Sequence, residues 1–129
     1  PGSSAGADER NNALLLERLL GRTGRERAAH YACHAALADP TGRVVAVSDG
    51  VCHGTIASSH RGTEGFGYDP LFVVREYWRT FGEIPPAVKA VISHRARALR
   101  SILPAIIAAL RPRGGSGTDG GAVSRVGIV

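Results

Sequence analysis

No apolar run in this sequence approaches the length that is needed to span a bilayer. The N-terminus also carries no basic region followed by an apolar stretch and a cleavage site, so nothing marks the chain for secretion. We therefore expect a cytoplasmic protein with no membrane partner. The 129 residues are enough for one modest domain and leave no room for a second full domain.

Cysteine and lysine are both scarce. Cys33 and Cys52 lie in apolar segments and show neither CxxC nor metal-ligand spacing, so we expect buried free thiols rather than a disulfide. Lys89 is the only lysine among 16 Lys and Arg residues, and the formal net charge is +5. The basic residues are scattered and form no run, which favours a small anionic ligand over a nucleic acid.

Local patterns in the first half of the chain predict a helix followed by a hairpin. Residues 1–12, "PGSSAGADERNN", have the composition of a loop, with Asp8 or Asn11 as candidate N-caps of an amphipathic helix that Gly21 ends. The "DPTG" turn predicts an antiparallel hairpin, in which residues 44–47 are a clear strand. The Ala-rich "AAHYACHAALA" before the turn fits a strand or a helix.

The second half of the chain predicts a strand and a long helix. "LFVV" at 71–74 indicates a short buried strand, and residues 93–110 have helical periodicity with Ser93 as the N-cap. Pro104 must kink this helix or begin a new one. Residues 111–129 are rich in Gly and Ser, so we expect a disordered tail after a domain of residues 1–110.

The stretch "EGFGYDPLF" places two glycines around a lone aromatic residue. A tight turn between strands would explain it. Glycine also lets a backbone approach a planar ligand, so Phe66 is a candidate for stacking on a base, with Asp69 as a nearby acceptor. The stretch matches neither GxGxxG nor GxxxxGK[ST], which excludes those phosphate-binding loops.

A second group of polar residues stands at the start of the predicted C-terminal helix. The simpler interpretation makes Ser93 a cap and leaves His94 and Arg95 in solvent. Cations at a helix N-terminus nevertheless oppose its dipole, at a cost of roughly a few tenths of a kcal/mol. Amide donors at such a terminus suit anions or carbonyl oxygens, and the sole lysine, Lys89, suits a point-charge contact with phosphate.

Taken in order, "RGTEGFGYDPLF", "TFGEI" and "KAVISHRARAL" resemble the inosine/xanthosine triphosphate pyrophosphatase family. That family hydrolyses non-standard purine nucleoside triphosphates, such as ITP, dITP and XTP, to monophosphates and pyrophosphate. The resemblance covers about residues 1–110 and implies an α/β fold with a mixed, curved β-sheet flanked by helices, bound Mg²⁺ and a homodimer. By position it also implies a set of substrate contacts: Phe66, Gly67, Tyr68 and Asp69 in the nucleoside pocket, Lys89 on the substrate, and His94 and Arg95 on the base.

The catalytic segments of that family are not found in this sequence. Members begin with an Asn/Lys-containing phosphate loop and take a metal-binding Glu and an Asp general base from a "DDSGL"-like segment, so the chain looks like the C-terminal part of an enzyme. No paired carboxylates are placed to hold Mg²⁺. The resemblance puts Asp69 in the pocket, and no catalytic residue is assigned. A catalytically inactive nucleotide-binding remnant and a basic nucleic-acid-binding module remain alternatives to the hydrolase.

Overall fold

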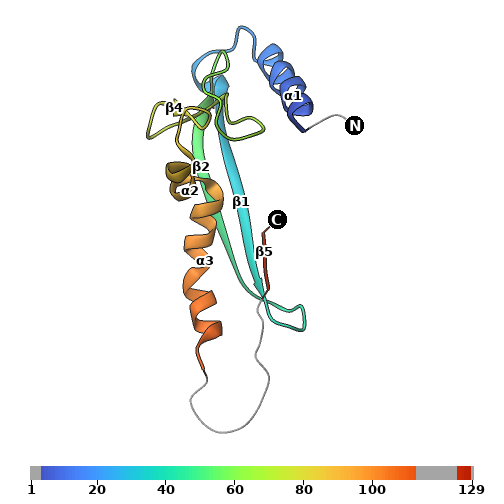
Figure 1. Cartoon of the computed structure of the whole chain (residues 1–129), viewed down its shortest axis with the longest axis vertical. Helices are drawn as coiled ribbons and strands as arrows, with labels where there is room; N and C mark the ends of the chain where they lie inside the picture. The colour runs from blue at the N-terminus through green and yellow to red at the C-terminus, as the bar shows by residue number, and fades with distance from the viewer. Residues whose placement is uncertain (1–3, 113–124, 129) are drawn as a thin grey trace. The chain divides into compact units, whose positions relative to one another are not determined.

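The computed structural model of the protein describes residues 4–112 and 125–128 (Figure 1). Its elements follow in the order α1 (Ser4–Arg18), η1 (Gly24–Arg27), β1 (Ala28–Ala38), β2 (Val44–Ile56), β3 (Phe72–Val74), β4 (Arg79–Thr80), α2 (Pro86–Ile92), α3 (His94–Leu110) and β5 (Arg125–Ile128). The strands are hydrogen-bonded in the order β4-β3-β2-β1-β5. The predicted α/β class is confirmed.

The two long strands, β1 and β2, form the predicted hairpin. They are neighbours in the sheet and are joined only by residues 39–43, a connection too short for a parallel crossover. The turn is closed by hydrogen bonds from Asp39 N–H to the Arg43 carbonyl and from Gly42 N–H to the Asp39 carbonyl, both 2.9 Å. The stretch "AAHYACHAALA" is therefore the strand β1 and not a helix.

The remaining pairings, β2–β3, β3–β4 and β1–β5, are also antiparallel. Within the described residues the sheet is therefore antiparallel and not mixed as the resemblance implied; β5 pairs with β1 although α2 and α3 separate it from β4 in the chain. The predicted strand at 71–74 is confirmed, since β3 is buried along its whole length.

The chain divides into two compact units. Unit 1 comprises Pro1–Tyr31 and Cys52–Ile92, and unit 2 comprises Ala32–Val51 and Ser93–Val129. The core of unit 1 is a cluster of buried residues: Cys52, Phe72, Val74, Phe81 and Ile84. The rings of Phe72 and Phe81 are stacked, with their centroids 5.6 Å apart.

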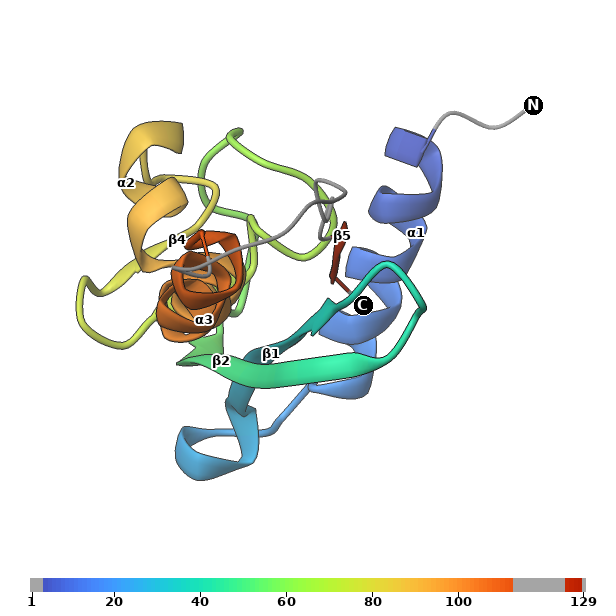
Figure 2. The same cartoon turned by 90° about the horizontal axis from the view of Figure 1, so that it is seen from below.

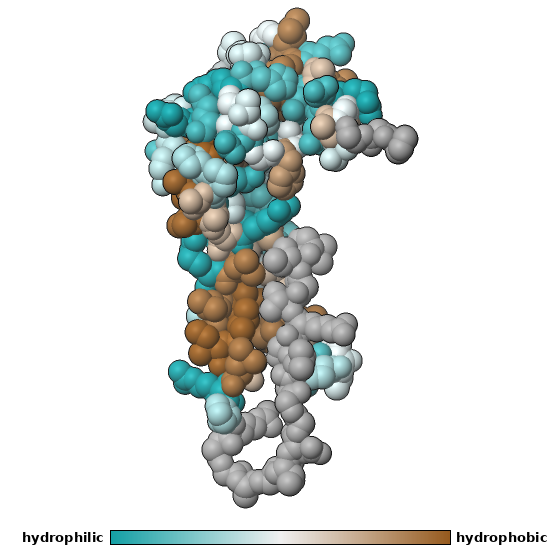
Figure 3. All heavy atoms as spheres, in the orientation of Figure 1, coloured by the Kyte–Doolittle hydropathy of each residue, from teal (hydrophilic) through white to brown (hydrophobic). Residues whose placement is uncertain are grey.

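In unit 2, α3 lies along one side of the β1–β2 hairpin (Figures 1 and 2). Its inner side packs Ala98 and Ile102 on Cys33, Ala35 and Leu37 of β1. A second apolar row on the helix is exposed and forms a continuous hydrophobic surface (Figure 3): Leu99, Leu103, Ile107 and Leu110. Cys33 and Cys52 are buried free thiols, as predicted.

The start of helix α1 differs from the prediction, whereas both ends of α3 agree with it. Helix α1 begins at Ser4, so the predicted loop at 1–12 is wrong for most of its length, and neither Asp8 nor Asn11 is an N-cap. Alanines in this segment favour a helix, and Asp8 makes a long-range contact described below. Helix α3 is capped by Ser93 and reaches Leu110 as predicted, and of the two predicted effects of Pro104 the start of a new helix is excluded, because α3 is one helix.

The predicted disordered tail, 111–129, falls mostly on residues 113–124 and 129, which lie outside the described residues. Arg125–Ile128 form β5, which pairs with residues 35–38 of β1. In the described part of the chain, no helix combines the length and the apolar character that a membrane crossing requires.

Candidate functional site

The GFGYDP segment forms a tight loop before β3 in unit 1. Gly65 and Gly67 both have positive φ, at 76° and 61°, which side chains rarely allow. A Cβ on Gly65 would also lie only 2.0 Å from Asp69 Oδ2. The loop is closed by hydrogen bonds from Asp69 N–H to the Phe66 carbonyl at 3.2 Å and from Leu71 N–H to the Tyr68 carbonyl at 2.9 Å. The tight turn is thus the means by which Phe66 is presented.

The carboxylate of Asp69 is the centre of this loop. The residue is 4% exposed, and its Oδ2 accepts hydrogen bonds from Phe66 N–H at 3.0 Å and from the ammonium of Lys89. A buried carboxylate of this kind must be paired and hydrogen-bonded to be tolerated. Asp69 therefore holds the loop and Lys89 together.

Phe66 and Lys89 form the exposed surface of the site. Phe66 is 63% exposed, and Lys89 Nζ lies 4.8 Å from the centroid of its ring and 5.4 Å from that of the buried Phe81. Both distances are within the range of cation–π attraction. An aromatic face beside an ammonium suits a planar ring that carries electronegative oxygen atoms.

The "TFGEI" segment is fastened to the start of the glycine-rich loop. Glu83 accepts hydrogen bonds from Thr80 N–H at 2.9 Å and from Arg61 Nε at 3.4 Å, and its Oε2 is ion-paired with Arg61 Nη2 at 3.0 Å. Thr80 Oγ1 in turn donates to the Arg61 carbonyl at 2.5 Å. The Thr80 N–H bond, with the charge of Arg61, lowers the pKa of Glu83 below its ordinary value. These contacts hold the "TFGEI" segment against Arg61, the first residue of "RGTEGFGYDPLF".

Helix α1 contributes two residues that sequence reasoning missed. Asp8 Oδ2 accepts a hydrogen bond from Gly67 N–H at 2.9 Å, and Asn12 Nδ2 donates to the Gly67 carbonyl at 3.0 Å. Asn12 is 4% exposed, whereas its neighbour Asn11 is exposed. The one signal in the sequence was the spacing of Asp8 and Asn12, which places two polar side chains on the same side of a helix.

Tyr68 lies in a different environment from Phe66. It lines an apolar cavity of about 400 Å³ whose wall includes Leu15 of α1, Leu19 just after that helix, and Phe72 of β3. Of the two aromatic residues beside Gly67, Tyr68 therefore lines this cavity, whereas the ring of Phe66 is exposed to solvent.

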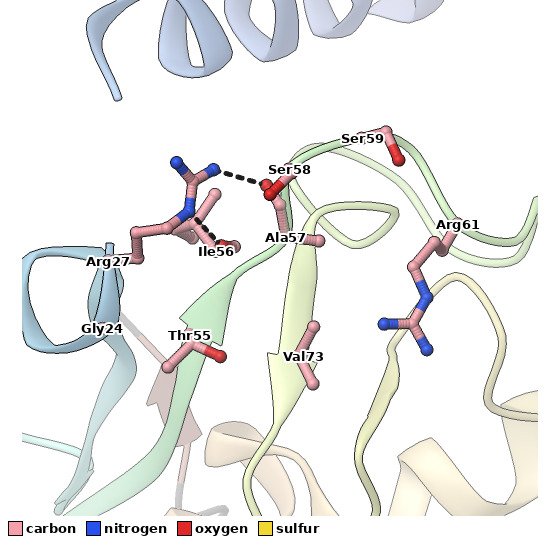
Figure 4. A pocket seen from close by; sticks show the side chains of 9 residues that line it. All are labelled: Gly24, Arg27, Thr55, Ile56, Ala57, Ser58, Ser59, Arg61 and Val73. Carbon is pink, nitrogen blue, oxygen red and sulfur yellow. Dashed lines mark hydrogen bonds between the residues drawn. The ribbon is translucent and has the colours of Figure 1, made fainter. Parts of the chain in front are cut away.

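A second hollow of about 480 Å³ is lined by Arg27, Arg61, Thr55 and two serines (Figure 4). Its arginines make bonds within the protein. Arg27 donates to the carbonyls of Ile56 at 2.8 Å, Ala57 at 2.7 Å and Leu19 at 2.9 Å, and Arg61 is paired with Glu83. We interpret this hollow as structural and not as an anion site, because these donors anchor η1 and the end of β2.

The structure brings five of the predicted site residues together in unit 1: Phe66, Gly67, Tyr68, Asp69 and Lys89. His94 and Arg95 belong to unit 2, where they are the first residues of α3. His94 is half-buried and Arg95 is exposed. Ser93 Oγ accepts from Ala96 N–H at 3.2 Å, which caps the helix.

The described residues do not fit a magnesium site. In residues 4–112 and 125–128, no three His, Cys, Asp or Glu side chains are grouped so that they could hold a metal ion. Asp69, the carboxylate within the loop, already binds Lys89 and the Phe66 N–H. No step of a reaction is therefore assigned to a metal held by these residues.

Comparisons with known proteins agree on one family. The model of the Ham1 family matches residues 2–105. A dITP/XTP pyrophosphatase of Rhodopirellula baltica is 47% identical over 102 residues, which are 79% of this chain and 49% of that protein. A dITP/XTP pyrophosphatase of an Exiguobacterium species is 48% identical over 101 residues, which are 78% of this chain and 50% of that protein.

The solved structure of a HAM1 protein from Coxiella burnetii matches the fold with a TM-score of 0.70 and 34% sequence identity. The match covers 78% of this chain and 52% of that one. This chain therefore spans about half the length of the curated relatives it matches.

Proposed function

Because this chain belongs to the Ham1 family, we propose that the protein hydrolyses non-standard purine nucleoside triphosphates to monophosphate and pyrophosphate. The names of the relatives described above support this activity. In this proposal the described residues bind the nucleotide, and the general base and the ligands of a Mg²⁺ ion come from the half of the family's length that this chain does not span. A homodimer, which the resemblance implies, and a cytoplasmic location are also part of the proposal.

The observation that carries the proposal is the exposed ring of Phe66 beside the ammonium of Lys89, both held by the buried Asp69. Stacking on an aromatic ring is worth about 1–3 kcal/mol per base and tolerates any base, because every base has a π-face. An ammonium has three donors, so the bond to Asp69 is compatible with a further bond to a ligand oxygen. The site thus offers a stacking surface and a positive charge to one ligand.

Calorimetric titration of the chain with inosine triphosphate tests this proposal. We expect saturable binding that weakens at least about tenfold in Phe66→Ala, since a stacking contact is lost. Tyr77→Ala is the matched control, because Tyr77 is 46% exposed and lies outside the loop. Equal affinities for the parent and Phe66→Ala would remove Phe66 from the site, and no binding by the parent would contradict the proposal as a whole.

A catalytically inactive nucleotide-binding protein is the second candidate, and the absence of a metal-holding group from the described residues favours it. In both cases we expect the purified chain with Mg²⁺ to release pyrophosphate from inosine triphosphate little faster than buffer. The half of a relative that this chain lacks can then be joined to it. If the joined protein releases pyrophosphate in a Mg²⁺-dependent manner, the result supports the hydrolase. Robust release by the chain alone would show that its own residues hold the metal ion. Nucleic acid is not proposed as a ligand, because the 16 basic residues form no run in the sequence.

A further inference from the structure

Helix α1 holds both backbone polar groups of a single loop residue, Gly67. Asp8 accepts from its N–H at 2.9 Å, and Asn12 donates to its carbonyl at 3.0 Å. These bonds join residues that are 59 and 55 positions apart in the sequence. Asp8 and Asn12 are four residues apart and so project from the same side of the helix. We call this pair the α1 clamp.

The clamp acts where two peptide planes meet. Gly67 shares one plane, which carries its N–H, with Phe66, and shares the other, which carries its carbonyl, with Tyr68. Holding both planes fixes the directions in which the two neighbouring side chains leave the backbone. A Cβ on Gly67 would meet no atom within 4 Å, so glycine is needed there for its φ of 61° and not for space.

The choice of residue at position 12 is explained by this contact. Asn12 is 4% exposed, and a buried amide is unfavourable unless it is hydrogen-bonded. Its Nδ2 serves Gly67, whereas its Oδ1 is buried and accepts no hydrogen bond within the described residues. The amide cannot be turned over, because Oδ1 would then face the Gly67 carbonyl oxygen, which is also an acceptor. If position 12 only filled space, an apolar residue would be more favourable there, so the hydrogen bond to Gly67 explains the asparagine.

We propose that Asp8 and Asn12 are positioning residues that hold Phe66 in the orientation in which it stacks on a nucleobase. The inference rests on the proposed function, since it concerns the same site. Asp69 holds the loop on the Phe66 N–H, and the clamp holds it at the next residue. The clamp itself touches no ligand and acts through Gly67.

Four substitutions in the 129-residue chain separate the contacts. Asn12→Asp is nearly isosteric but places an acceptor against the Gly67 carbonyl, and Asp8→Ala removes the acceptor for the Gly67 N–H. Asp8→Asn keeps a side-chain oxygen for that bond and should restore it. Glu9→Gln is the matched control, because Glu9 is an exposed neighbour on the same helix.

Each variant is titrated with inosine triphosphate and with inosine, which keeps the base and lacks the phosphates. We expect both ligands to bind about tenfold more weakly to Asn12→Asp and to Asp8→Ala, the size of one hydrogen bond. Asp8→Asn and Glu9→Gln should bind like the parent. Circular dichroism shows whether each variant is folded. If Asn12→Asp does not fold, the affinities of Asp8→Ala alone test the inference.

The outcomes distinguish this inference from the proposed function. Equal affinities in the parent and the clamp variants would overturn the clamp, as would a loss seen with inosine triphosphate but not with inosine, because the effect would then lie at the phosphates. If the parent binds neither ligand, the proposed function fails. In that case the rate of hydrogen exchange at the Gly67 amide tests the clamp. If this amide exchanges no faster in Asp8→Ala than in the parent, the clamp is overturned.

Discussion

Lys89 and Asp69 form an ion pair in which the carboxylate side chain is 6% exposed and the ammonium side chain is 22% exposed. The same carboxylate accepts the N–H of Phe66. A carboxylate this deeply buried is costly unless it is paired. The pair therefore joins helix α2 to the glycine-rich loop and contributes to the stability of unit 1. A ligand that competes with Asp69 for Lys89 would weaken this connection.

A double-mutant cycle at this pair should show strong coupling. Lys89→Ala leaves the Asp69 charge buried without its partner and should lower the free energy of unfolding by about 3 kcal/mol. Adding Asp69→Asn removes that charge and should recover part of the loss. Urea unfolding of the parent, both single variants and the double variant measures the coupling. Strictly additive changes would mean that the pair contributes little and is open to solvent.

Two isoleucines on helix α3 offer a matched test of its inner and outer sides. Ile102 is 1% exposed in the core of unit 2, and Ile107 is 46% exposed in the second apolar row. Ile102→Ala should cost about 2–5 kcal/mol of stability, because it leaves a cavity between α3 and β1. Ile107→Ala should change stability by no more than about 0.5 kcal/mol. Similar losses in urea unfolding would show that Ile107 is covered in solution.

Sequence reasoning succeeded where a feature depends on near neighbours. The turn at 39–43, the buried strand β3 and the cap Ser93 each follow from residues within a few positions. The order of motifs was enough to find the family and to predict that Phe66 and Lys89 lie near each other, which the 4.8 Å between Lys89 Nζ and the Phe66 ring centroid confirms.

What the sequence could not provide is the set of contacts between distant segments. Asp8 was interpreted as a cap, because caps are local, whereas its real partner is 59 residues away. The sequence does not predict that Asn12 is buried, because burial depends on what packs over a helix and not on the residue itself. Pro104 predicts a kink or the start of a new helix, and no new helix begins there, because the residues after it, Ala105 and Ile106, pack on the core within α3.

The pH dependence of stability should reveal the bonds of Glu83. The Thr80 N–H bond and the charge of Arg61 lower its pKa below the ordinary 4.5. A carboxylate whose pKa is lowered by folding stabilises the protein above its unfolded pKa, and this stability is lost as pH falls below about 4.5 through the folded value. Glu83→Gln should therefore lower the melting temperature at neutral pH and flatten its decline in acid. Glu17→Gln, an exposed carboxylate of α1, is the control, and identical acid profiles for the parent and Glu83→Gln would contradict the prediction.

The resemblance implies that Arg95 contacts the base, and this role predicts selectivity between purines. Hypoxanthine and xanthine present a carbonyl oxygen at the six position, where adenine presents an amino group, which is a donor. A guanidinium has only donors, so it bonds that oxygen and leaves a donor unpaired against adenine, which gives discrimination of about 10²-fold or better. Arg95 is exposed at the start of α3, where cations oppose the helix dipole, so a role in ligand binding would account for it.

Arg95→Ala should consequently weaken binding of inosine triphosphate while leaving that of adenosine triphosphate almost unchanged. The ratio of the two dissociation constants, measured by calorimetry, should shrink by about tenfold or more, because the variant loses a charge-assisted hydrogen bond to one ligand only. Arg100→Ala is the control, since it removes the same charge from an exposed position on the same helix and should leave the ratio unchanged. If Arg95→Ala weakens both nucleotides by the same factor, Arg95 contacts the phosphates or supports the fold, and the base is read by other residues.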